Sequence, residues 1–530
     1  MAPSPAPATT IGGDVVVAAS ATATEAATAT GRRGRLSGGN RCRRAWWTAF
    51  VALFLMMAGW AVAMPEGGNS DEVAHIERAY AAATGQVVGA PSRDTLNRPA
   101  ATFAVPASLI PRDVECMYRS RTSAACLSFP TTRNFVKVNS WTGRYNPLYY
   151  LPTGIPMAIS PTFAGVVAGR LVSALMCAAV LASAFSAAVR MGSRLLNAAV
   201  LLAITPAALD LCGAINPNGM EIAAAVLMWT SGLVLIRRGD ALSASDRARL
   251  RAMFVVAACI LLVVRALGPL WFGLSICALA LVLGRRRTWE VLRSRPIWPA
   301  ALIGGAGVVG VAWNMVADNY SYYPMQSTTD NLYRNGLLFH STASNLAMLL
   351  ENGVDTWIRE DVGVAVESAS ITPWVLVLLW LMPVSALIAA GLLSTTRNHR
   401  IAILAVVVAP FAVTAYVELS YVRMLGWTQN GRYFLPLSVG AVLIAAAVAP
   451  RFPKSWNVAP RVIRTTVVIT GICHLASLAI VLSRFKSGFT SAPNPLGGSW
   501  HPPFGTAVPF VLMVAGLMVQ SRAIFSRASR

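Results

Sequence analysis

The chain has 530 residues and a net charge of +22, with 55% hydrophobic and only 12% charged residues. A soluble protein normally carries about a quarter charged residues, so the composition excludes an ordinary soluble protein. In a membrane protein an excess of lysine and arginine mostly records topology, and the basic character is therefore not a sign of nucleic-acid binding.

Apolar runs of roughly 18 to 25 residues recur along the chain, each long enough to cross a bilayer of about 30 Å. They predict an all-α polytopic membrane protein of about 12 transmembrane helices. The predicted spans are 45–64, 161–189, 195–210, 219–236, 252–267, 269–284, 297–317, 372–393, 400–419, 434–449, 462–483 and 506–521. Basic clusters then fall on alternate connections, which predicts a multi-pass plasma-membrane protein with both termini cytoplasmic.

The regions outside the spans differ in expected role. Residues 1–44 are predicted to be a disordered basic cytoplasmic tail, because the first part is rich in Ala, Thr, Pro and Gly and lacks aromatic residues. A transmembrane domain follows over 45–524, and 525–530 form a cytoplasmic C-terminal tail. Two long extracytoplasmic loops are expected, at 65–160 and 318–371, and loops of this length usually carry function.

The first span has an alternative interpretation. Ala61, Val62 and Ala63 before Met64 resemble the small-residue cleavage site of a signal peptide. The apolar run is longer than the apolar core of a usual signal peptide. The basic segment before it is also much longer than the N-terminal basic region of a signal peptide. An uncleaved anchor is therefore the preferred interpretation.

Of the eight cysteines, only Cys116 and Cys126 fall in a predicted extracytoplasmic loop. Outside the cytoplasm two such residues can form a disulfide, and the alternative is a pair of free thiols. The disulfide is preferred. The other cysteines show no spacing typical of metal ligands.

Two adjacent carboxylates, Asp71 and Glu72, follow the first span within a few residues. They begin a predicted short helix at 71–84, in which Ser70 is a plausible N-cap and acidic residues suit the first turn. The pattern therefore has a purely structural interpretation. The functional one takes a carboxylate as general base toward an acceptor hydroxyl. Asp71 and His75 share a helical face, whereas Glu72 points away by roughly 100°.

Further polar residues lie at the predicted extracytoplasmic ends of spans. Arg144 and Tyr149 belong to an aromatic and proline cluster that suits a membrane interface, and Arg144 is also a candidate phosphate ligand. Asn218 and Glu221 belong to a polar turn at 210–221, where Asp210 and Glu221 can also line a site.

Two arginines near the lipid are costly unless they face a cavity or a partner. Arg265 ends the fifth predicted span, where it either snorkels to the interface or contacts a lipid phosphate. Arg432, followed by Tyr433, opens the tenth span on the side where basic residues are rare. It suits an anionic substrate, and it can equally pair with Glu418 or with lipid headgroups.

Taken in order, these motifs resemble the actinobacterial branch of the DUF2142 family of predicted membrane proteins. The resemblance runs from the first span to about the tenth. It rests on four ordered segments, namely 65–80 with Asp71, Glu72, His75, Arg78 and Tyr80; 145–152 with Pro147, Tyr149 and Tyr150; 216–221; and 431–436. The segment 363–373 matches the family's second loop only loosely.

That family in turn resembles the GT-C superfamily of membrane glycosyltransferases, which take a sugar from a polyprenyl-phosphate donor and keep a carboxylate in the first outer loop. The resemblance implies Asp71 as the catalytic carboxylate, with Glu72 as its partner. It makes Arg432 and Arg265 candidates for binding the donor phosphate, although family members often carry lysine near the position of Arg265.

The sequence therefore favours an inverting, GT-C-type glycosyltransferase on the outer face of the plasma membrane. Its expected partners are membrane lipids, a polyprenyl-phosphate sugar donor and a glycan or lipid-linked acceptor, with no nucleic acid. The expected site comprises Asp71, Glu72, His75, Arg144, Tyr149, Asn218, Glu221, Arg265, Arg432 and Tyr433. No cofactor is implied beyond an optional divalent cation at Asp71 and Glu72. The alternatives are a transporter or flippase of a lipid-linked or small hydrophilic substrate, and a non-catalytic assembly scaffold.

Overall fold

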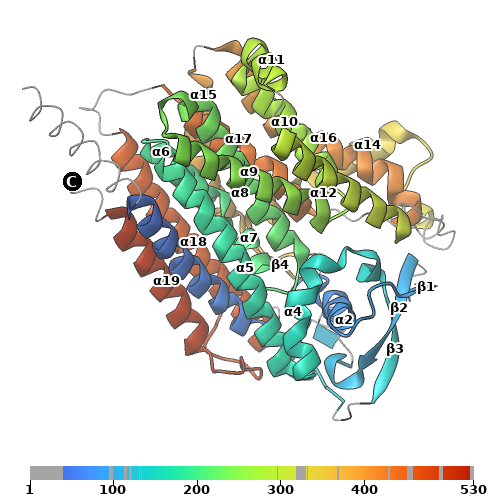
Figure 1. The fold of residues 1–530 in the computed structure, drawn as a ribbon. Helices are drawn as coiled ribbons and strands as arrows, with labels where there is room; N and C mark the ends of the chain where they lie inside the picture. Colours follow the sequence, from blue (N-terminus) through green and yellow to red (C-terminus); the bar gives the residue numbers. More distant parts are fainter. Residues whose placement is uncertain are drawn as a thin grey trace, which may run out of the picture.

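The computed structural model describes residues 40–525 apart from 95–98, 113–115, 118–121, 131, 133, 295–296, 318–329, 331, 367–368, 395, 426, 428–429, 451–457 and 489–492. Nearly all of the predicted N-terminal tail, and the C-terminal tail apart from its first residue, lie outside the described residues. The described chain is mainly helical, and Figure 1 shows its long helices side by side in a bundle.

Among the residues that the structure describes, seven helices are long and apolar enough to cross a membrane. They are the N-terminal helix Asn40–Ala63, α5 (Phe163–Val189), α8 (Pro217–Arg238), α12 (Ile297–Val316), α15 (Trp374–Leu392), α16 (Arg397–Leu425) and α18 (Val458–Ser487). The N-terminal helix lies beside α18 and α19 (Ala507–Phe525), so the two ends of the described chain meet along one side of the bundle (Figure 1).

Two helix pairs are bent spans or re-entrant segments, which raises the count of candidate spans to as many as nine. The pair α6 (Arg194–Ala203) and α7 (Pro206–Cys212) bends by 66°, and α10 (Gly268–Leu283) and α11 (Arg285–Arg293) bend by 113°. Pro206 explains the first break, because a proline favours the first turn of a new helix and cannot continue an old one.

The other predicted spans fall on α9 (Ala244–Val264), α17 (Leu435–Val448) and α19. The helices α17 and α19 are apolar but short, and the first two turns of α9 carry Asp246 and several arginines. Length and composition therefore confirm a mainly helical fold with several candidate membrane helices. The expected count of about 12 stays a prediction.

The first long loop folds into a small domain at one end of the bundle, away from the basic helix α11 (Figure 1). It contains α2 (Glu72–Ala83), β1 (Ala90–Arg93), β2 (Pro99–Pro106), η1 (Ala107–Leu109), η2 (Ala124–Cys126), β3 (Phe135–Ser140), η3 (Trp141–Arg144) and α4 (Pro147–Ile159). The strands form an antiparallel sheet in the order β1-β2-β3, with Phe103 opposite Val138. The sequence analysis did not foresee this sheet.

The helix α2 packs between the sheet and α4, and its contact with α4 is unusually close. A Cβ atom at Gly154 of α4 would lie 1.9 Å from the carbonyl oxygen of Ala79 in α2. Only glycine allows two backbones to approach to this distance. The position of α2, and with it of Asp71, is therefore set by backbone packing against α4.

The second long loop contains α14 (Thr342–Val362) and a small hairpin of β4 (Ala365–Val366) and β5 (Ala369–Ser370). The helix α14 contacts α15, α16 and the short helix η5 (Gly431–Tyr433), which opens α17. A further short helix, η4 (Gly239–Ala241), follows α8. The second loop thus lies against the segment that carries Arg432.

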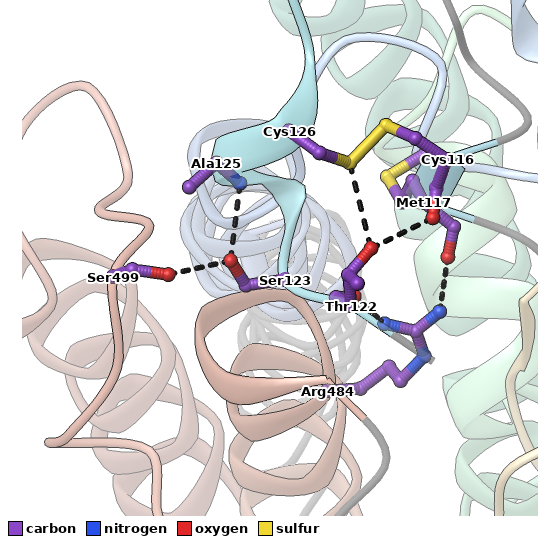
Figure 2. The surroundings of a disulfide bond; sticks show 8 residues. All are labelled: Cys116, Met117, Thr122, Ser123, Ala125, Cys126, Arg484 and Ser499. Atoms are coloured by element: carbon purple, nitrogen blue, oxygen red, sulfur yellow. Dashed lines mark hydrogen bonds between the residues drawn. A yellow bond between two sulfur atoms is a disulfide. The ribbon is translucent and has the colours of Figure 1, made fainter. Parts of the chain in front are cut away.

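Cys116 and Cys126 form a disulfide, as preferred from the sequence. Figure 2 shows that the loop it closes is attached to the end of α18. Arg484 of α18 donates hydrogen bonds to the carbonyl oxygens of Thr122 and Met117, and the Ser123 and Ser499 hydroxyls lie 2.6 Å apart. These hydrogen bonds therefore connect the disulfide-closed part of the first loop to the C-terminal helices, and the one between Met117 and Arg484 joins residues 367 apart in sequence.

Candidate functional site

Asp71 lies at the entrance to α2 in an unusual backbone conformation. Its φ of 62° is the one left-handed value among the described non-glycine residues. Aspartate tolerates this region better than most residues, but the conformation still persists only where its surroundings hold it. Asn216 donates to the carbonyl oxygen of Ser70, and the Ser70 hydroxyl contacts the carbonyl oxygen of Ala365. Turns from two distant parts of the chain therefore hold the residue before Asp71.

The expected N-cap was Ser70, and the structure corrects this. The helix begins at Glu72, Asp71 is the N-cap, and the Asp71 side chain makes no capping hydrogen bond. It forms an ion pair with Arg432 instead. The carboxylates of Asp71 and Glu72 reach different partners, as the sequence suggested. The reason differs, because Asp71 lies outside the helix and does not share a helical face with His75.

Arg432 is held in place from α14. The backbone N–H of Gly431 donates a 2.9 Å hydrogen bond to Oε2 of Glu360, and a Cβ at Gly431 would lie 2.2 Å from the carbonyl oxygen of Trp357. Burial lowers the pKa of Arg432, but the neighbouring Asp71 carboxylate raises it, and the net effect is an increase. Its Nε and Nη1 atoms are buried and make no hydrogen bond to any described residue.

Arg265 joins the same cluster from the end of α9. Its guanidinium carbon lies 4.7 Å from the ring centroid of Tyr433, and that of Arg432 lies 5.3 Å from the same ring. Arg265 also pairs with Glu221 of α8 at 3.3 Å. It therefore faces a partner inside the protein and does not snorkel, and two cations and the carboxylate of Asp71 meet around Tyr433.

Glu72 belongs to a buried ion pair. Both Glu72 and Arg170 of α5 are fully buried, and they form a bidentate pair with distances of 2.7 and 2.5 Å. Arg170 also donates to the carbonyl oxygens of Ala61, Met64 and Pro65. Glu72 therefore has a structural role in holding Arg170, and the catalytic role implied by the resemblance stays a prediction.

His75 and Tyr149 make buried hydrogen bonds close to the site. Nδ1 of His75 shares a 2.8 Å hydrogen bond with the Tyr150 hydroxyl, and burial lowers the pKa of His75 to about 3. The Tyr149 hydroxyl lies 2.8 Å from that of Ser173 and accepts from the backbone of Asn216. Both side chains are buried and hydrogen-bonded within the protein, and their expected contact with a substrate stays a prediction.

Arg144 is not part of the cluster around Tyr433. It donates a 2.9 Å hydrogen bond to the carbonyl oxygen of Ala317 at the end of α12. Asn218, in contrast, lies in the first turn of α8 beside the Asn216 turn, and its Oδ1 atom is buried without a partner among the described residues. The expected binding residues therefore divide between two places.

Further buried polar atoms lie on Glu221, which was expected in the site, and on three residues that the sequence did not single out, Glu66, Asn69 and Glu360. Both carboxylate oxygens of Glu66 and both side-chain polar atoms of Asn69 are buried without a hydrogen bond to any described residue, as are Oε1 of Glu221 and Oε1 of Glu360. Native proteins rarely leave such groups unsatisfied. Water or a ligand is therefore expected to complete these bonds. The only sequence signal was their position, Glu66 and Asn69 between the first span and Asp71.

A family model described as "Predicted membrane protein (DUF2142)" matches residues 54–441. The chain belongs to this family. The matched region contains the N-terminal helix from its middle onward, Asp71, α14 and Arg432, and it ends within α17. Neither a curated protein nor a solved structure matches the chain.

The optional divalent cation does not suit the arrangement found in this DUF2142 member. Asp71 and Glu72 each face an arginine, which already neutralises the carboxylate. Within the described ranges, no group of three or more His, Cys, Asp or Glu residues is placed to hold a metal.

Glu66 predicts a pH dependence of stability. Burial raises its pKa to about 8, against an ordinary 4.5. The pKa of Glu66 is higher in the folded protein than in the unfolded chain. The contribution of its protonated carboxyl to the free energy of unfolding is therefore complete below the unfolded-state pKa, and it is lost as the pH rises through the folded-state pKa. We expect the melting temperature in detergent to fall over this range, and Glu66→Gln to flatten the fall. An equal slope in the two proteins would contradict the assignment.

Proposed function

We propose that this chain is a GT-C-type membrane glycosyltransferase that moves a sugar from a polyprenyl-phosphate donor to a cell-envelope acceptor on the outer face of the plasma membrane. One observation carries the proposal: Asp71 pairs with Arg432, and Arg432 and Arg265 contact the same ring of Tyr433. A base beside two cations suits a reaction in which a hydroxyl loses a proton while a phosphate leaves.

In the proposed reaction the donor phosphate takes the place of Asp71 on Arg432. A planar guanidinium binds phosphate well, and Nε and Nη1 of Arg432 have no competing partner among the described residues. The released carboxylate of Asp71 accepts the proton of the acceptor hydroxyl. The acceptor oxygen bonds to the anomeric carbon from the opposite side, the bond from that carbon to the phosphate oxygen breaks, and polyprenyl phosphate leaves with its charge held by the arginines.

The buried polar atoms nearby support a sugar as the transferred group. Both carboxyl oxygens of Glu66, the side-chain amide of Asn69 and Oε1 of Glu360 make no hydrogen bond to any described residue. Such groups accept and donate hydrogen bonds in the way that sugar hydroxyls require. The apolar helices around the site would hold the polyprenyl chain, as lipids are the expected neighbours of these surfaces.

The direct test uses the purified full chain in detergent, without a membrane gradient. The donor is a polyprenyl-phosphate [14C]sugar, offered in turn as mannose, glucose and arabinose, and the acceptor is an envelope extract from a strain lacking the gene. Transfer of label to the extract supports the proposal. Absence of transfer, together with donor movement across the bilayer of proteoliposomes, would favour the flippase alternative.

Arg432→Gln is expected to raise the KM for the donor at least about tenfold, because a charge-assisted hydrogen bond contributes about 1.5–3 kcal/mol. Arg190 offers a matched control, since it pairs with Asp246 at 3.0 Å and its side chain is 5% exposed, against 6% for Arg432. Arg190→Gln should leave the KM unchanged. A similar KM for wild type and Arg432→Gln would remove Arg432 from donor binding.

A further inference from the structure

A pocket of about 440 Å³ lies beside the first-loop sheet, away from the Asp71–Arg432 pair. Its walls come from β1, the start of β2, η3 and the end of α12, and they include Ser92, Arg93, Gly143, Arg144 and Trp313. None of its lining residues belongs to the cluster around Tyr433. The volume lies within the roughly 300–1,000 Å³ that small-molecule sites occupy.

The pocket is preformed by contacts between its walls. The indole N–H of Trp313 donates a 3.0 Å hydrogen bond to the carbonyl oxygen of Arg144, whose Nε donates to Ala317. A Cβ at Gly143 or at Gly89 would lie 2.6 or 2.7 Å from the ring of Phe103. The two glycines therefore allow η3 and the residues just before β1 to pack directly against the ring of Phe103.

The chemistry of the lining suits a particular kind of ligand. Arg93 and Arg144 provide two guanidinium groups, and Trp313 provides an aromatic surface. The Ser92 hydroxyl is buried and makes no hydrogen bond to any described residue. An apolar ring face, a hydroxyl partner and two cations together match a sugar ring that carries an acidic group.

We propose that this pocket binds an anionic carbohydrate. Resting on the proposed function, the ligand is part of the acceptor, held away from its reacting hydroxyl. The segment between the pocket and the candidate site supports this role. Arg144 lines the pocket, while its neighbour Tyr145 contacts Arg265 at 5.8 Å and the ring of His75 at 6.1 Å. One short segment thus separates the two sites, and an extended glycan can reach both.

The test measures binding to the purified full chain by isothermal titration calorimetry. The probes are tri-galacturonate with carboxylates, glucose 1-phosphate with a phosphate, neutral maltotriose, and inorganic phosphate. We expect an acidic sugar to bind at least about tenfold more tightly than maltotriose or inorganic phosphate, since charge and ring both contribute. The stronger of the two acidic probes identifies the acidic group. Equally tight binding of inorganic phosphate, maltotriose and the two acidic sugars would overturn the proposal.

Variants locate the binding. Arg93 is exposed, so Arg93→Gln should fold normally. This variant is expected to weaken the binding of the acidic probe about tenfold. Arg93→Lys should restore part of the lost affinity. Trp313→Ala should weaken the binding of the acidic sugars and of neutral maltotriose. Arg286→Gln and Trp289→Ala, on exposed positions of α11, are matched controls without effect. If Arg93→Gln and Trp313→Ala leave binding unchanged while folding normally, the pocket is not the site.

This outcome is separable from that of the proposed reaction. Asp71→Asn should leave tri-galacturonate or glucose 1-phosphate binding intact, because Asp71 does not line the pocket. Loss of transfer with retained binding supports both proposals. Retained transfer in Asp71→Asn with weakened binding in Arg93→Gln would overturn the reaction and leave the carbohydrate site standing.

Discussion

Asp71→Asn is expected to lower sugar transfer about 100- to 10,000-fold, the range that a positioned general base contributes. Asparagine has the same size and tolerates the left-handed conformation that Asp71 adopts, with φ of 62°. The substitution therefore removes the proton acceptor with little disturbance of the entrance to α2. Initial rates with the [14C]sugar donor, measured beside the melting temperature, separate a chemical loss from a folding loss.

The chain contains a closely matched control. Asp246 pairs with Arg190 at 3.0 Å, and its side chain is 33% exposed, against 32% for Asp71. The control pair lies between the end of α5 and the start of α9, away from the first loop. Asp246→Asn should cost similar stability and no activity. Full transfer activity in Asp71→Asn would remove Asp71 from the mechanism.

Arg170→Met is expected to destabilise the protein by at least about 3–5 kcal/mol, because it leaves Glu72 as an unpaired buried charge. It also removes the donors to the carbonyl oxygens of Ala61, Met64 and Pro65 at the end of the N-terminal helix. Glu72→Gln should cost less, since those carbonyl bonds remain. The measurements are melting temperature in detergent and the yield of monodisperse protein.

The double variant Glu72→Leu with Arg170→Met sharpens this expectation. Apolar replacement of a buried pair often restores stability, but here the three carbonyl groups stay without their donor. Recovery should therefore be partial. Glu290→Gln on α11 is the control, since its pair with Arg286 is exposed on both sides, at 93% and 59%, and contributes little. If Arg170→Met is no more costly than Glu290→Gln, the pair does not anchor the first helix.

The two adjacent carboxylates thus have separate tasks. Glu72 joins the start of α2 to Arg170 of α5, and Arg170 in turn binds the end of the N-terminal helix, so this pair holds the loop from which Asp71 extends. Asp71 remains partly exposed and meets Arg432 from a segment some 360 residues further along the chain.

The sequence alone predicted the features that depend on local composition. Apolar runs predicted the position of each of the seven described helices that are long and apolar enough to cross a membrane, and the position of two cysteines in one loop indicated the disulfide. Glu72 and Arg170 illustrate the limit. Their pairing joins the start of α2 to the middle of another helix, and nothing in the order of residues shows which distant charge a carboxylate will meet.

What only the tertiary structure decided is which charges lie together. Arg432 was conspicuous as a basic residue at the end of a span, yet an anionic substrate, Glu418 and lipid headgroups were the partners that the sequence suggested, and Asp71 was not among them. The choice of Asp71 follows from the packing of α14 on η5 through Glu360 and from the approach of α2 to α4 at Gly154. Hydropathy is a property of short segments and can be read along the chain. An ion pair depends on the relative position of segments far apart in sequence, which only packing determines.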